Sequence, residues 1–444
     1  MSSQRLLQYD TNYPLYGISF SNSPSHPFRI ALTTVSTSST NKLIVVDQKQ
    51  QQSHHHHHHH HSHYNQPSSS GSSDFQQLTS HSLNFPATKV GWEPRESLSS
   101  VGYEDGGGRG ELIATSGDAL RIYEVAKEWN GNDTGYVNKG NNGWTDSGEG
   151  SYTVKSRSVL TNSKMPHSSL PPVTSFSWNP ISTQSIVTCS IDTTATYWDI
   201  NTSQAKTQLI AHDRAVYDLS WLPHSSDIFV SVGADGSLRA FDLRQLEHST
   251  ILYESSKDTP LARIAFSKKE QHMMACFGLD DSKILVLDMR SPGQPVAELG
   301  GHSAPLGAVA WGAPGRGDST GGGWIASCGD DSQLLLYDLT SPLPESRPPS
   351  TSNTKPSRSN TTTNPNSYDT LSPPITPESR NRGRSISRGE STASQSNNSS
   401  GGDPLEILPV RGWTAENEIN NLAFSEKGDW VGCVSGGRLN VLAM

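Results

Sequence analysis

The chain has 444 residues, of which only 32% are hydrophobic, and its 38 glycines and 27 prolines indicate that part of it lies outside any packed core. Its 34 basic and 43 acidic residues give a net charge of -9, which argues against direct binding to nucleic acid or to a membrane surface. The four cysteines form no CxxC pair and no apolar run approaches the ~18 residues of a membrane span, so we expect no disulfide framework, no metal site and no transmembrane segment.

The chain starts with MSSQRLLQYD, which is no secretory signal peptide and favours an intracellular protein. Within residues 5–47, the segments YPLYGISF, FRIALTTV and KLIVVD read as β-strands, and RLLQYD (5–10) is a further apolar segment. Residues 48–83 are dominated by Gln, His and Ser, with an unbroken run from His54 to His61, so we expect a disordered insertion. Adjacent imidazoles can chelate Zn²⁺ or Ni²⁺ weakly, but we interpret the run as a neutral repeat expansion.

Residues 84–127 repeat the strand pattern in PATKVGW, ELIATSGD and ALRIYEV. Residues 128–169 are rich in Gly, Asn and Ser and are expected to form a second disordered insertion. Residues 170–340 then carry four clear copies of one pattern, in which a turn aspartate precedes a last-strand aromatic or apolar residue by six positions. These turn aspartates are Asp192, Asp235, Asp281 and Asp331, and the last-strand residues are Trp198, Phe241, Leu287 and Tyr337.

Residues 341–404 are rich in Ser, Thr, Pro and Asn and are expected to form a third disordered insertion. Ser372 and Thr376 each precede a proline, and Ser385 and Ser387 each follow an arginine at the third position before them. Such serines and threonines in an accessible segment are candidate phosphorylation sites.

Residues 405–444 contain a seventh copy, with strands in EINNLAF, DWVGCVS and RLNVL, after which the sequence ends. The segment 5–10 would supply the fourth, outermost strand of this copy and close a ring. In the clear copies the closing aspartates lie 43, 46 and 50 residues apart, and a period near 40–45 residues with a Trp-Asp dipeptide is typical of propeller blades. We therefore predict an all-β fold, a seven-bladed WD40-type β-propeller with three disordered insertions.

Several long strings resemble the Transparent Testa Glabra / anthocyanin-regulator family of WD40 proteins. They are TSFSWNP (174–180), SIDTTATYWDI (190–200), KTQLIAHDRAVYDLSW (206–221), FVSVGADGSLRAFDLRQLEHSTILYE (229–254), PVAEL (295–299) and EINNLAF (418–424). The plant members bridge MYB and bHLH transcription factors, and the animal members bind DYRK and HIPK kinases and can serve as substrate receptors of cullin–RING ligases. The resemblance thus implies protein partners of these kinds and a location in nucleus and cytoplasm. The three insertions depart from the compact members of the family.

One blade carries a histidine, a strand serine and a turn aspartate, the residue types of a hydrolase triad, and a second blade repeats them at equivalent positions. A catalytic triad does not occur twice at equivalent repeat positions. We therefore interpret both sets, with the aromatic at the Trp position, as buried structural networks that hold the blades. The predicted network residues are His212, Ser231, Asp235, Phe241, His302, Ser327, Asp331, Tyr337, Asp192 and Trp198.

Two adjacent blades end in an aspartate followed two residues later by an arginine: Asp242 with Arg244, and Asp288 with Arg290. This spacing resembles the WDxR box by which substrate receptors of cullin ligases dock their adaptor. Alternatively, each arginine pairs with an acidic neighbour at the propeller rim. The sequence leaves both interpretations open.

The sequence shows no converging acid, base, nucleophile or metal cluster, so we expect the chain not to be an enzyme and to need no cofactor. The leading hypothesis is a scaffold that assembles transcription regulators or protein kinases. The alternative is a substrate receptor of a cullin–RING E3 ubiquitin ligase. A propeller enzyme, the third class, would need charged residues that converge on the central channel.

Overall fold

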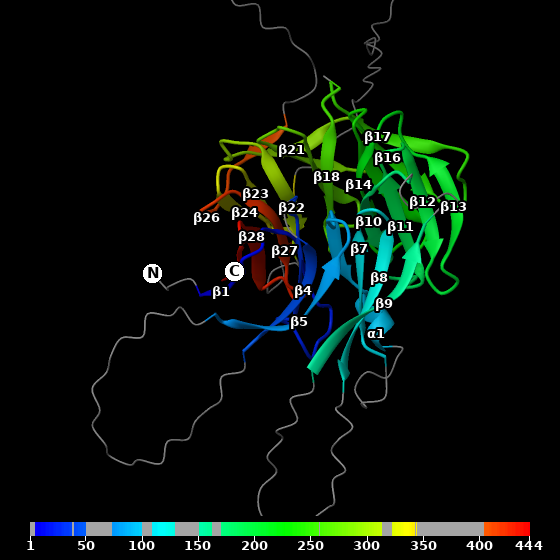
Figure 1. The fold of residues 1–444 in the computed structure, drawn as a ribbon. Coiled ribbons are helices and arrows are strands. Elements are labelled where there is room, and N and C mark those ends of the chain that lie inside the picture. The colour runs from blue at the N-terminus through cyan, green and yellow to red at the C-terminus, as the bar shows by residue number, and fades with distance from the viewer. Residues whose placement is uncertain are drawn as a thin grey trace, which may run out of the picture. The chain divides into compact units, whose positions relative to one another are not determined.

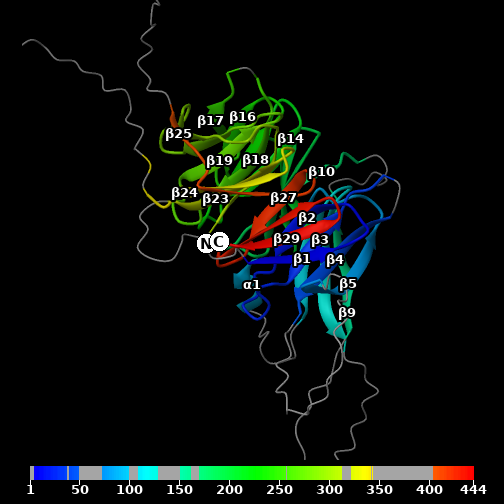
Figure 2. The same cartoon turned by 90° about the vertical axis from the view of Figure 1, so that its left-hand side faces the viewer.

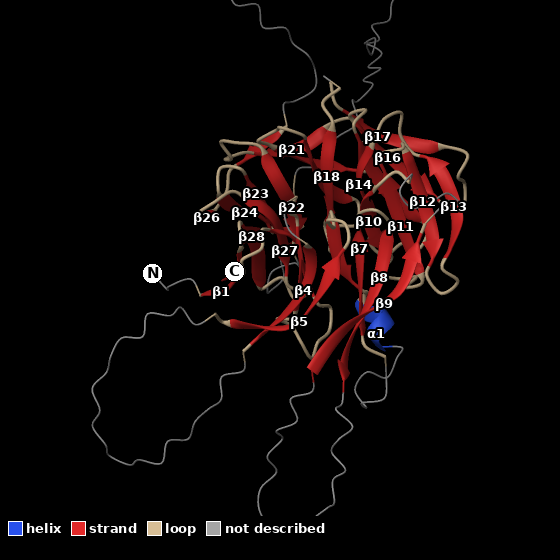
Figure 3. Ribbon diagram, viewed as in Figure 1, coloured by secondary structure: helices blue, strands red, loops and turns tan. Residues whose placement is uncertain are grey.

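The computed structural model describes residues 5–37, 40–49, 73–99, 109–128, 151–161, 170–256, 258–312, 322–341, 343 and 404–444. These residues belong to a unit formed by residues 1–346 and 404–444, and the second unit, 347–403, lies outside the described ranges. Strands dominate, and the short helix α1 (Arg95–Ser99) is the one α-helix in these ranges (Figure 3). Within them, no helix is long and apolar enough to cross a membrane.

The strands form seven sheets, which we number as blades 1 to 7 (Figure 1). Blade 1 contains β2 (Leu15–Phe20), β3 (Ile30–Thr34), β4 (Asn41–Gln48) and β5 (Phe75–Leu83). Blade 2 contains β6 (Lys89–Trp92), β7 (Glu111–Ser116), β8 (Leu120–Glu128) and β9 (Ser151–Leu160). Blade 3 contains β10 (Val173–Trp178), β11 (Ser185–Ser190), β12 (Thr194–Asp199) and β13 (Gln204–Ile210).

Blade 4 contains β14 (Val216–Trp221), β15 (Ile228–Gly233), β16 (Ser237–Asp242) and β17 (Ser249–Glu254). Blade 5 contains β18 (Leu261–Phe266), β19 (Met273–Gly278), β20 (Ile284–Asp288), β21 (Pro295–Leu299) and β25 (Leu405–Ile407). Blade 6 contains β22 (Leu306–Trp311), β23 (Gly323–Gly329), β24 (Gln333–Leu339) and β26 (Arg411–Thr414). Blade 7 contains β27 (Ile419–Phe424), β28 (Trp430–Ser435), β29 (Arg438–Ala443) and β1 (Leu6–Asp10).

Each blade has one innermost strand, and it contacts the innermost strands of both neighbouring blades. In blades 1 to 7 these strands are β2, β6, β10, β14, β18, β22 and β27. These contacts run from β2 round to β27, and β27 contacts β2 in turn. The ring is therefore complete, and the predicted seven-bladed propeller is confirmed. Apolar clusters fill the spaces between blades. The cluster between blades 3 and 4, for example, joins Cys189 to Trp221 and Phe229.

The first and last strands of the chain share one sheet. β1 pairs antiparallel with β29 from Leu6↔Leu442 to Asp10↔Arg438, so residues 5–10 lie at the outer edge of blade 7 (Figure 2). The other edge of β1 is also covered. The backbone N–H of Gln8 donates to Asp74 Oδ2 (2.8 Å), and the N–H of Asp74 donates to the carbonyl of Gln8 (3.0 Å). The closing strand therefore exposes little unpaired backbone for edge-to-edge association.

Two outer strands lie inside segments that the sequence analysis assigned to disordered insertions. β5 occupies the end of the 48–83 segment, and β9 lies within the 128–169 segment. Both sequences are polar because an outer strand buries few of its side chains. β9 buries only Leu160, and β5 buries only Phe75 and Leu83. The predicted boundaries of these two insertions are therefore wrong at their C-terminal sides.

The segment that follows residue 403 contributes to three blades, whereas the sequence analysis assigned all of 405–444 to blade 7. β26 pairs antiparallel with β24 and completes blade 6. β25 pairs in parallel with β21 and adds a fifth strand to blade 5. Only β27, β28 and β29 belong to blade 7. The predicted range of 170–340 for blades 3 to 6 therefore omits the outer strand of blade 6.

Blades 1 and 2 are joined by a buried ion pair. The guanidinium of Arg29 and the carboxylate of Glu111 are each 1% exposed and in direct contact. Arg29 Nη2 also donates to the hydroxyl of Tyr152 (3.2 Å), and Ser21 Oγ donates to Glu111 (2.6 Å). Because a buried charge is costly unless it is paired and hydrogen-bonded, these contacts fix the two blades against each other.

Candidate protein-docking site

The loops of the propeller lie on two faces. The inner strands begin on one, which we call the start face, and end on the other, which we call the end face. Because the sheets are antiparallel, the turns between the second and third strands of a blade lie on the start face. The turns between the third and fourth strands lie on the end face.

The predicted histidine networks lie near the start face of blades 4 and 6. In blade 4, His212 Nδ1 is 2.9 Å from Asp235 Oδ1, and its Nε2 is 2.7 Å from Ser231 Oγ. Burial lowers the pKa of His212, although Asp235 opposes this effect, so the ring is neutral near pH 7. A neutral ring donates from Nδ1 to the carboxylate and accepts at Nε2 from the serine. Blade 6 repeats this arrangement. His302 Nδ1 lies 3.0 Å from Asp331 Oδ1, and His302 Nε2 lies 2.7 Å from Ser327 Oγ.

The aromatic residues predicted for these networks behave differently. Phe241 has no polar atom to contribute and stacks on Phe229 with ring centroids 5.1 Å apart. Tyr337 donates its hydroxyl proton to the carbonyl of Gly300 (3.0 Å). In blade 3, Trp198 donates to Thr188 Oγ1 (2.8 Å), and Asp192 accepts from the backbone N–H of Thr194 (3.1 Å). In blade 6 the polar network extends from His302 to Asp331 and Ser327 and on to Tyr337, whose side chain hydrogen-bonds with Ser327. In blade 4 it extends from His212 to Asp235 and Ser231, and Phe241 belongs to the apolar core instead.

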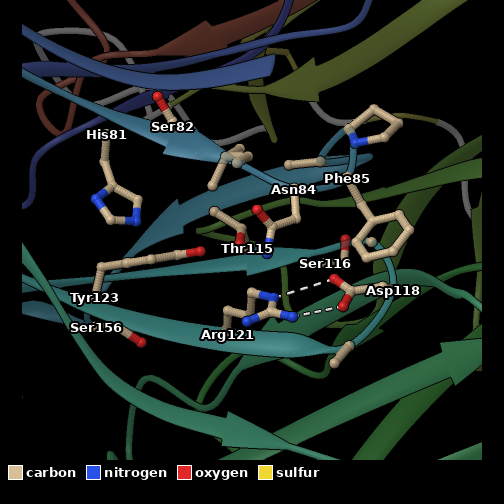
Figure 4. Close-up of a pocket in the computed structure, with 15 residues that line it drawn as sticks. His81, Ser82, Asn84, Phe85, Thr115, Ser116, Asp118, Arg121, Tyr123 and Ser156 are labelled. Atoms are coloured by element: carbon tan, nitrogen blue, oxygen red, sulfur yellow. Dashed lines mark hydrogen bonds and ion pairs between the residues drawn. The ribbon is translucent and has the colours of Figure 1, made fainter. Parts of the chain in front are cut away.

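Blade 2 has no such histidine network at its start face. A pocket of about 120 Å³ lies at this corner. In it, His81 faces Tyr123 and Arg121 is held by Asp118 (Figure 4). The rings of His81 and Tyr123 have centroids 5.2 Å apart, and Arg121 Nη2 lies 2.5 Å from Asp118 Oδ2. Burial lowers the pKa of His81, and Arg121 is already paired. The pocket therefore offers little charge to a ligand.

The two Asp-x-Arg sequences lie in turns on the end face of blades 4 and 5. Arg244 Nε is 2.8 Å from Asp242 Oδ1, and Arg290 Nη2 is 2.7 Å from Asp288 Oδ2. The hydrogen bonds from Arg244 lower the pKa of Asp242 to about 2. The arginine side chains remain 65% and 57% exposed. Each arginine thus pairs with the aspartate of its own turn, as the alternative interpretation expected, and still presents its outer surface to solvent.

Other predicted sites lie outside the described residues. These are the phosphorylation candidates Ser372, Thr376, Ser385 and Ser387, and the histidine run 54–61. The four cysteines are buried and unpaired, and burial raises the pKa of Cys276 to about 12. Among the residues with described positions, no group of three or more His, Cys, Asp or Glu side chains is arranged to hold a metal ion.

A groove with an aromatic floor occupies the end face. All seven inner strands end in an aromatic residue at this face, namely Phe20, Trp92, Trp178, Trp221, Phe266, Trp311 and Phe424. Blades 1 to 5 and 7 line the groove, which has a volume of about 610 Å³. A concave, largely apolar surface with a few polar groups is the usual form of a binding site.

The floor of this groove is held in place by hydrogen bonds to backbone. Trp178 Nε1 donates to the carbonyl of Thr183 (2.7 Å) within its blade. Trp92 and Trp221 donate to carbonyls of the preceding blade, those of Ser19 (3.1 Å) and Ser177 (2.9 Å). The indole rings are thus fixed before any partner binds, which reduces the entropy that binding would cost.

Apolar and charged side chains stand at the edge of the groove. Ile181 follows Trp178 in the next loop and is 51% exposed, although it is a large hydrophobic residue. Lys268 and Glu426 lie on the opposite side with 3.8 Å between their charged atoms. An exposed apolar residue beside a rigid aromatic floor and a charged rim is typical of a protein-binding surface.

Below the groove, the inner strands place one residue each at the same position facing the central channel. This position lies three residues before the terminal aromatic of each strand. Its occupants, which we call the channel ring, are Gly17, Lys89, Ser175, Asp218, Arg263, Ala308 and Asn421. In six of the seven strands a β-bulge immediately precedes this residue. A bulge re-aims the next side chain, which explains how the ring residues come to point the same way.

Three charged side chains meet in the channel ring. Lys89 Nζ lies 3.1 Å from Asp218 Oδ1 and 3.0 Å from Ser175 Oγ. Ser175 Oγ donates to the same carboxylate oxygen (2.5 Å), and the backbone N–H of Ile264 donates to the other (3.1 Å). Burial raises the pKa of Asp218, but the charges of Lys89 and Arg263 and these hydrogen bonds outweigh it and keep the pKa below its usual value.

Sequence reasoning missed this cluster and expected no convergence of acid and base. The signal that could have found it is the position three residues before each terminal aromatic, where Lys89, Asp218 and Arg263 fall in their repeats. Asp218 is fully ionised near pH 7 and both of its oxygens accept hydrogen bonds, so it is a weak general base. The geometry favours electrostatic recognition over proton transfer.

Comparisons with known proteins agree with the repeat structure. The family model described as "WD domain, G-beta repeat" matches residues 203–242 and 293–338. Over 341 residues the chain is 33% identical to the "DDB1- and CUL4-associated factor 7 homolog" of Dictyostelium discoideum, which covers 77% of this chain and 86% of the relative. It is also 34% identical over 376 residues to an uncharacterized WD repeat-containing protein of Schizosaccharomyces pombe, covering 81% and 75% of the two chains. A WD repeat-containing protein of Saccharomyces cerevisiae is 37% identical over 286 residues, which cover 60% of this chain and 52% of the relative.

Proposed function

The chain belongs to the WD-repeat family of β-propeller proteins, and on this basis we propose that it is a non-catalytic scaffold whose end face binds other proteins. The observation that carries the proposal is the groove of about 610 Å³ with its fixed tryptophan floor and the exposed Ile181 beside it. A rigid apolar surface of this kind is stable when free and gains from being covered.

The proposal is tested by site-specific photo-crosslinking in cells. A photoreactive amino acid at position 181, in the loop beside the groove, should label partner proteins. The same amino acid at position 213 serves as the control, because Asp213 lies on the start face of blade 4 with its side chain 83% exposed. Equal labelling from both positions, or none from position 181, would contradict docking at the end face.

The class of partner belongs to the same proposal. Strings such as SIDTTATYWDI (190–200) resemble the Transparent Testa Glabra / anthocyanin-regulator family, which supports MYB or bHLH transcription factors or DYRK-like kinases as partners and a location in nucleus and cytoplasm. Pull-down with purified proteins of these classes tests this narrower assignment. Failure of all of them to bind would remove it and leave the scaffold proposal to the crosslinking result.

A second candidate is a substrate receptor of a cullin–RING ubiquitin ligase. Two observations favour it: the Dictyostelium relative is a DDB1- and CUL4-associated factor 7 homolog, and Arg244 and Arg290 are exposed in adjacent turns of the end face. An exposed arginine can form planar, paired hydrogen bonds with a carboxylate of a partner. The scaffold proposal depends on the groove, whereas the ligase alternative depends on Arg244 and Arg290. Mutations in the groove and mutations of the two arginines therefore test the two candidates separately.

A further inference from the structure

The channel ring carries a surplus positive charge. Of the described residues that line the channel cavity of about 160 Å³, the ionisable ones are Lys89, Asp218 and Arg263. One carboxylate therefore faces two cations, and the remaining lining is apolar or carries hydroxyl and amide groups such as those of Thr174 and Asn421. A charge confined by low-dielectric walls is screened less than one at the surface, so the surplus attracts an anion.

The two cations also have hydrogen-bond donors to spare. A lysine has three donors, and the described contacts of Lys89 use two, to Ser175 and Asp218. An arginine has five, and Arg263 uses two, to the carbonyl of Ala262 (3.3 Å) and to the hydroxyl of Tyr16 (3.3 Å). Ala308 and Asn421, which are neutral members of the ring, line the same cavity as these donors.

The channel cavity adjoins the groove on the end face. Lys89 and Val90 line both spaces, and the Lys89 side chain is 39% exposed. A chain segment bound on the tryptophan floor would therefore pass directly over the mouth that leads to the ring. An acidic side chain of that segment could enter the channel while its apolar neighbours stay on the floor.

We infer that the end face recognises a partner segment in which one Asp or Glu, flanked by apolar residues, places its carboxylate in the channel against Lys89 and Arg263. This inference rests on the proposed function, since it names the chemistry of the segment that the groove binds. The groove and the exposed Ile181 at its edge supply apolar contact, and the ring supplies selectivity. A neutral segment would leave the surplus charge uncompensated, and a basic one would add to it.

The test selects peptides from a random twelve-residue display library on the full-length protein and measures the affinity of the enriched sequences. Enriched peptides should share one acidic position between apolar residues. Replacing that residue by its amide should weaken binding by about 30-fold or more, the usual loss when one member of a desolvated charge pair is removed. The same replacement should cost almost nothing on the variant Lys89→Met, whereas on Lys268→Met, at the groove rim, it should cost the full factor.

A second variant guards against misfolding of Lys89→Met. Asn421→Asp keeps the size of the side chain and places a carboxylate of the protein itself in the ring, so it should remove the preference for acidic peptides while apolar contacts persist.

Enriched peptides that bind the groove without an acidic requirement would overturn the inference and leave the proposed function intact. Failure to enrich any peptide whose binding is lost on Ile181→Glu would instead count against the proposed function. Tighter binding of a phosphoserine peptide than of its Glu counterpart would overturn the carboxylate assignment.

Discussion

Lys89 Nζ and Asp218 Oδ1 lie 3.1 Å apart, although their strands belong to blades 2 and 4 and blade 3 stands between them. The contact spans a whole blade because the inner strands converge on a narrow channel, and Ser175 of blade 3 bonds to both charged groups. Together with Ser175, the pair therefore links blades 2, 3 and 4, and it places charge in the channel.

Removing the carboxylate should destabilise the propeller. Asp218→Asn leaves two cations facing each other without their counter-charge, and we expect a loss of about 2 kcal/mol in the free energy of unfolding, less than for a fully buried pair because Lys89 is 39% exposed. Urea denaturation at pH 7 measures it. Asp213→Asn, at an exposed aspartate, should change stability by no more than about 0.5 kcal/mol. Equal effects of the two changes would show that the pair is energetically unimportant.

The histidine network predicts a pH dependence of stability. Burial lowers the pKa of His212 in the folded chain below its unfolded value of 6.5, so the unfolded chain binds a proton that the folded chain does not. Stability should therefore fall as the pH falls below 6.5. His212→Gln should cost about 1–3 kcal/mol at pH 7, because Ser231 loses its partner and Asp235 loses its histidine partner while keeping its bonds from Ser237 and Arg239, and should flatten this slope. Urea midpoints that decline in parallel for both proteins between about pH 7 and 5 would contradict the assignment of a neutral histidine.

The closing strand predicts a sharp difference between two short truncations. Removal of residues 1–10 takes away β1, with Leu7 and Tyr9 buried at 5% and 8% exposure, and uncovers the edge of β29. We expect a loss of several kcal/mol and a tendency to aggregate, because an uncovered edge pairs with other chains. Removal of residues 1–3 should leave the melting temperature unchanged. Similar thermal stability of both truncated proteins would mean that the ring does not depend on β1.

The two exposed arginines give a test of the ligase alternative. Arg244→Ala combined with Arg290→Ala should lower the melting temperature by no more than a few degrees, because both arginines are exposed and the backbone N–H at each position still donates to Asp242 or to the buried Asp288. If these side chains dock a cullin-ligase adaptor, recovery of that adaptor in a quantitative pull-down should fall by at least tenfold, as for other interface arginines that cost about 2 kcal/mol. An unchanged partner list from the folded double variant would exclude the ligase reading of these turns.

The fold was largely predictable, because the inner strands are apolar segments that end in Trp or Phe, and in the four clear copies the turn aspartate precedes the last-strand residue by the same six positions. The outer strands were harder. β5 and β9 expose most of their side chains and therefore look like the polar insertions beside them. β25 and β26 follow residue 403, so nothing local connects them with blades 5 and 6. β25 and β26 pair with the free edges of β21 and β24, and these edges are available at the right place only once the ring has assembled.

The candidate site was less predictable than the fold. Lys89, Asp218 and Arg263 lie in separate repeats, and each alone looks like an ordinary polar residue in a strand. Their convergence follows from the closure of the ring and from the bulges before them. The histidine networks were found because both blades carry the same residue types at equivalent positions. Phe241 was misplaced there, since position in the repeat does not reveal whether an aromatic side chain can hydrogen-bond.

The central claim, that partners dock on the end face, is tested most directly with two isoleucines of blade 3. Ile181 is 51% exposed beside the groove, and Ile210 is 78% exposed on the outer strand β13. Quantitative affinity purification should lose the main partners at least tenfold with Ile181→Glu, since a charge at the edge of an apolar interface costs about 1.4 kcal/mol or more. Ile210→Glu should retain them, and both variants should melt with the parent. Retention of the same partners by Ile181→Glu, or their equal loss from both variants, would contradict docking at the end face.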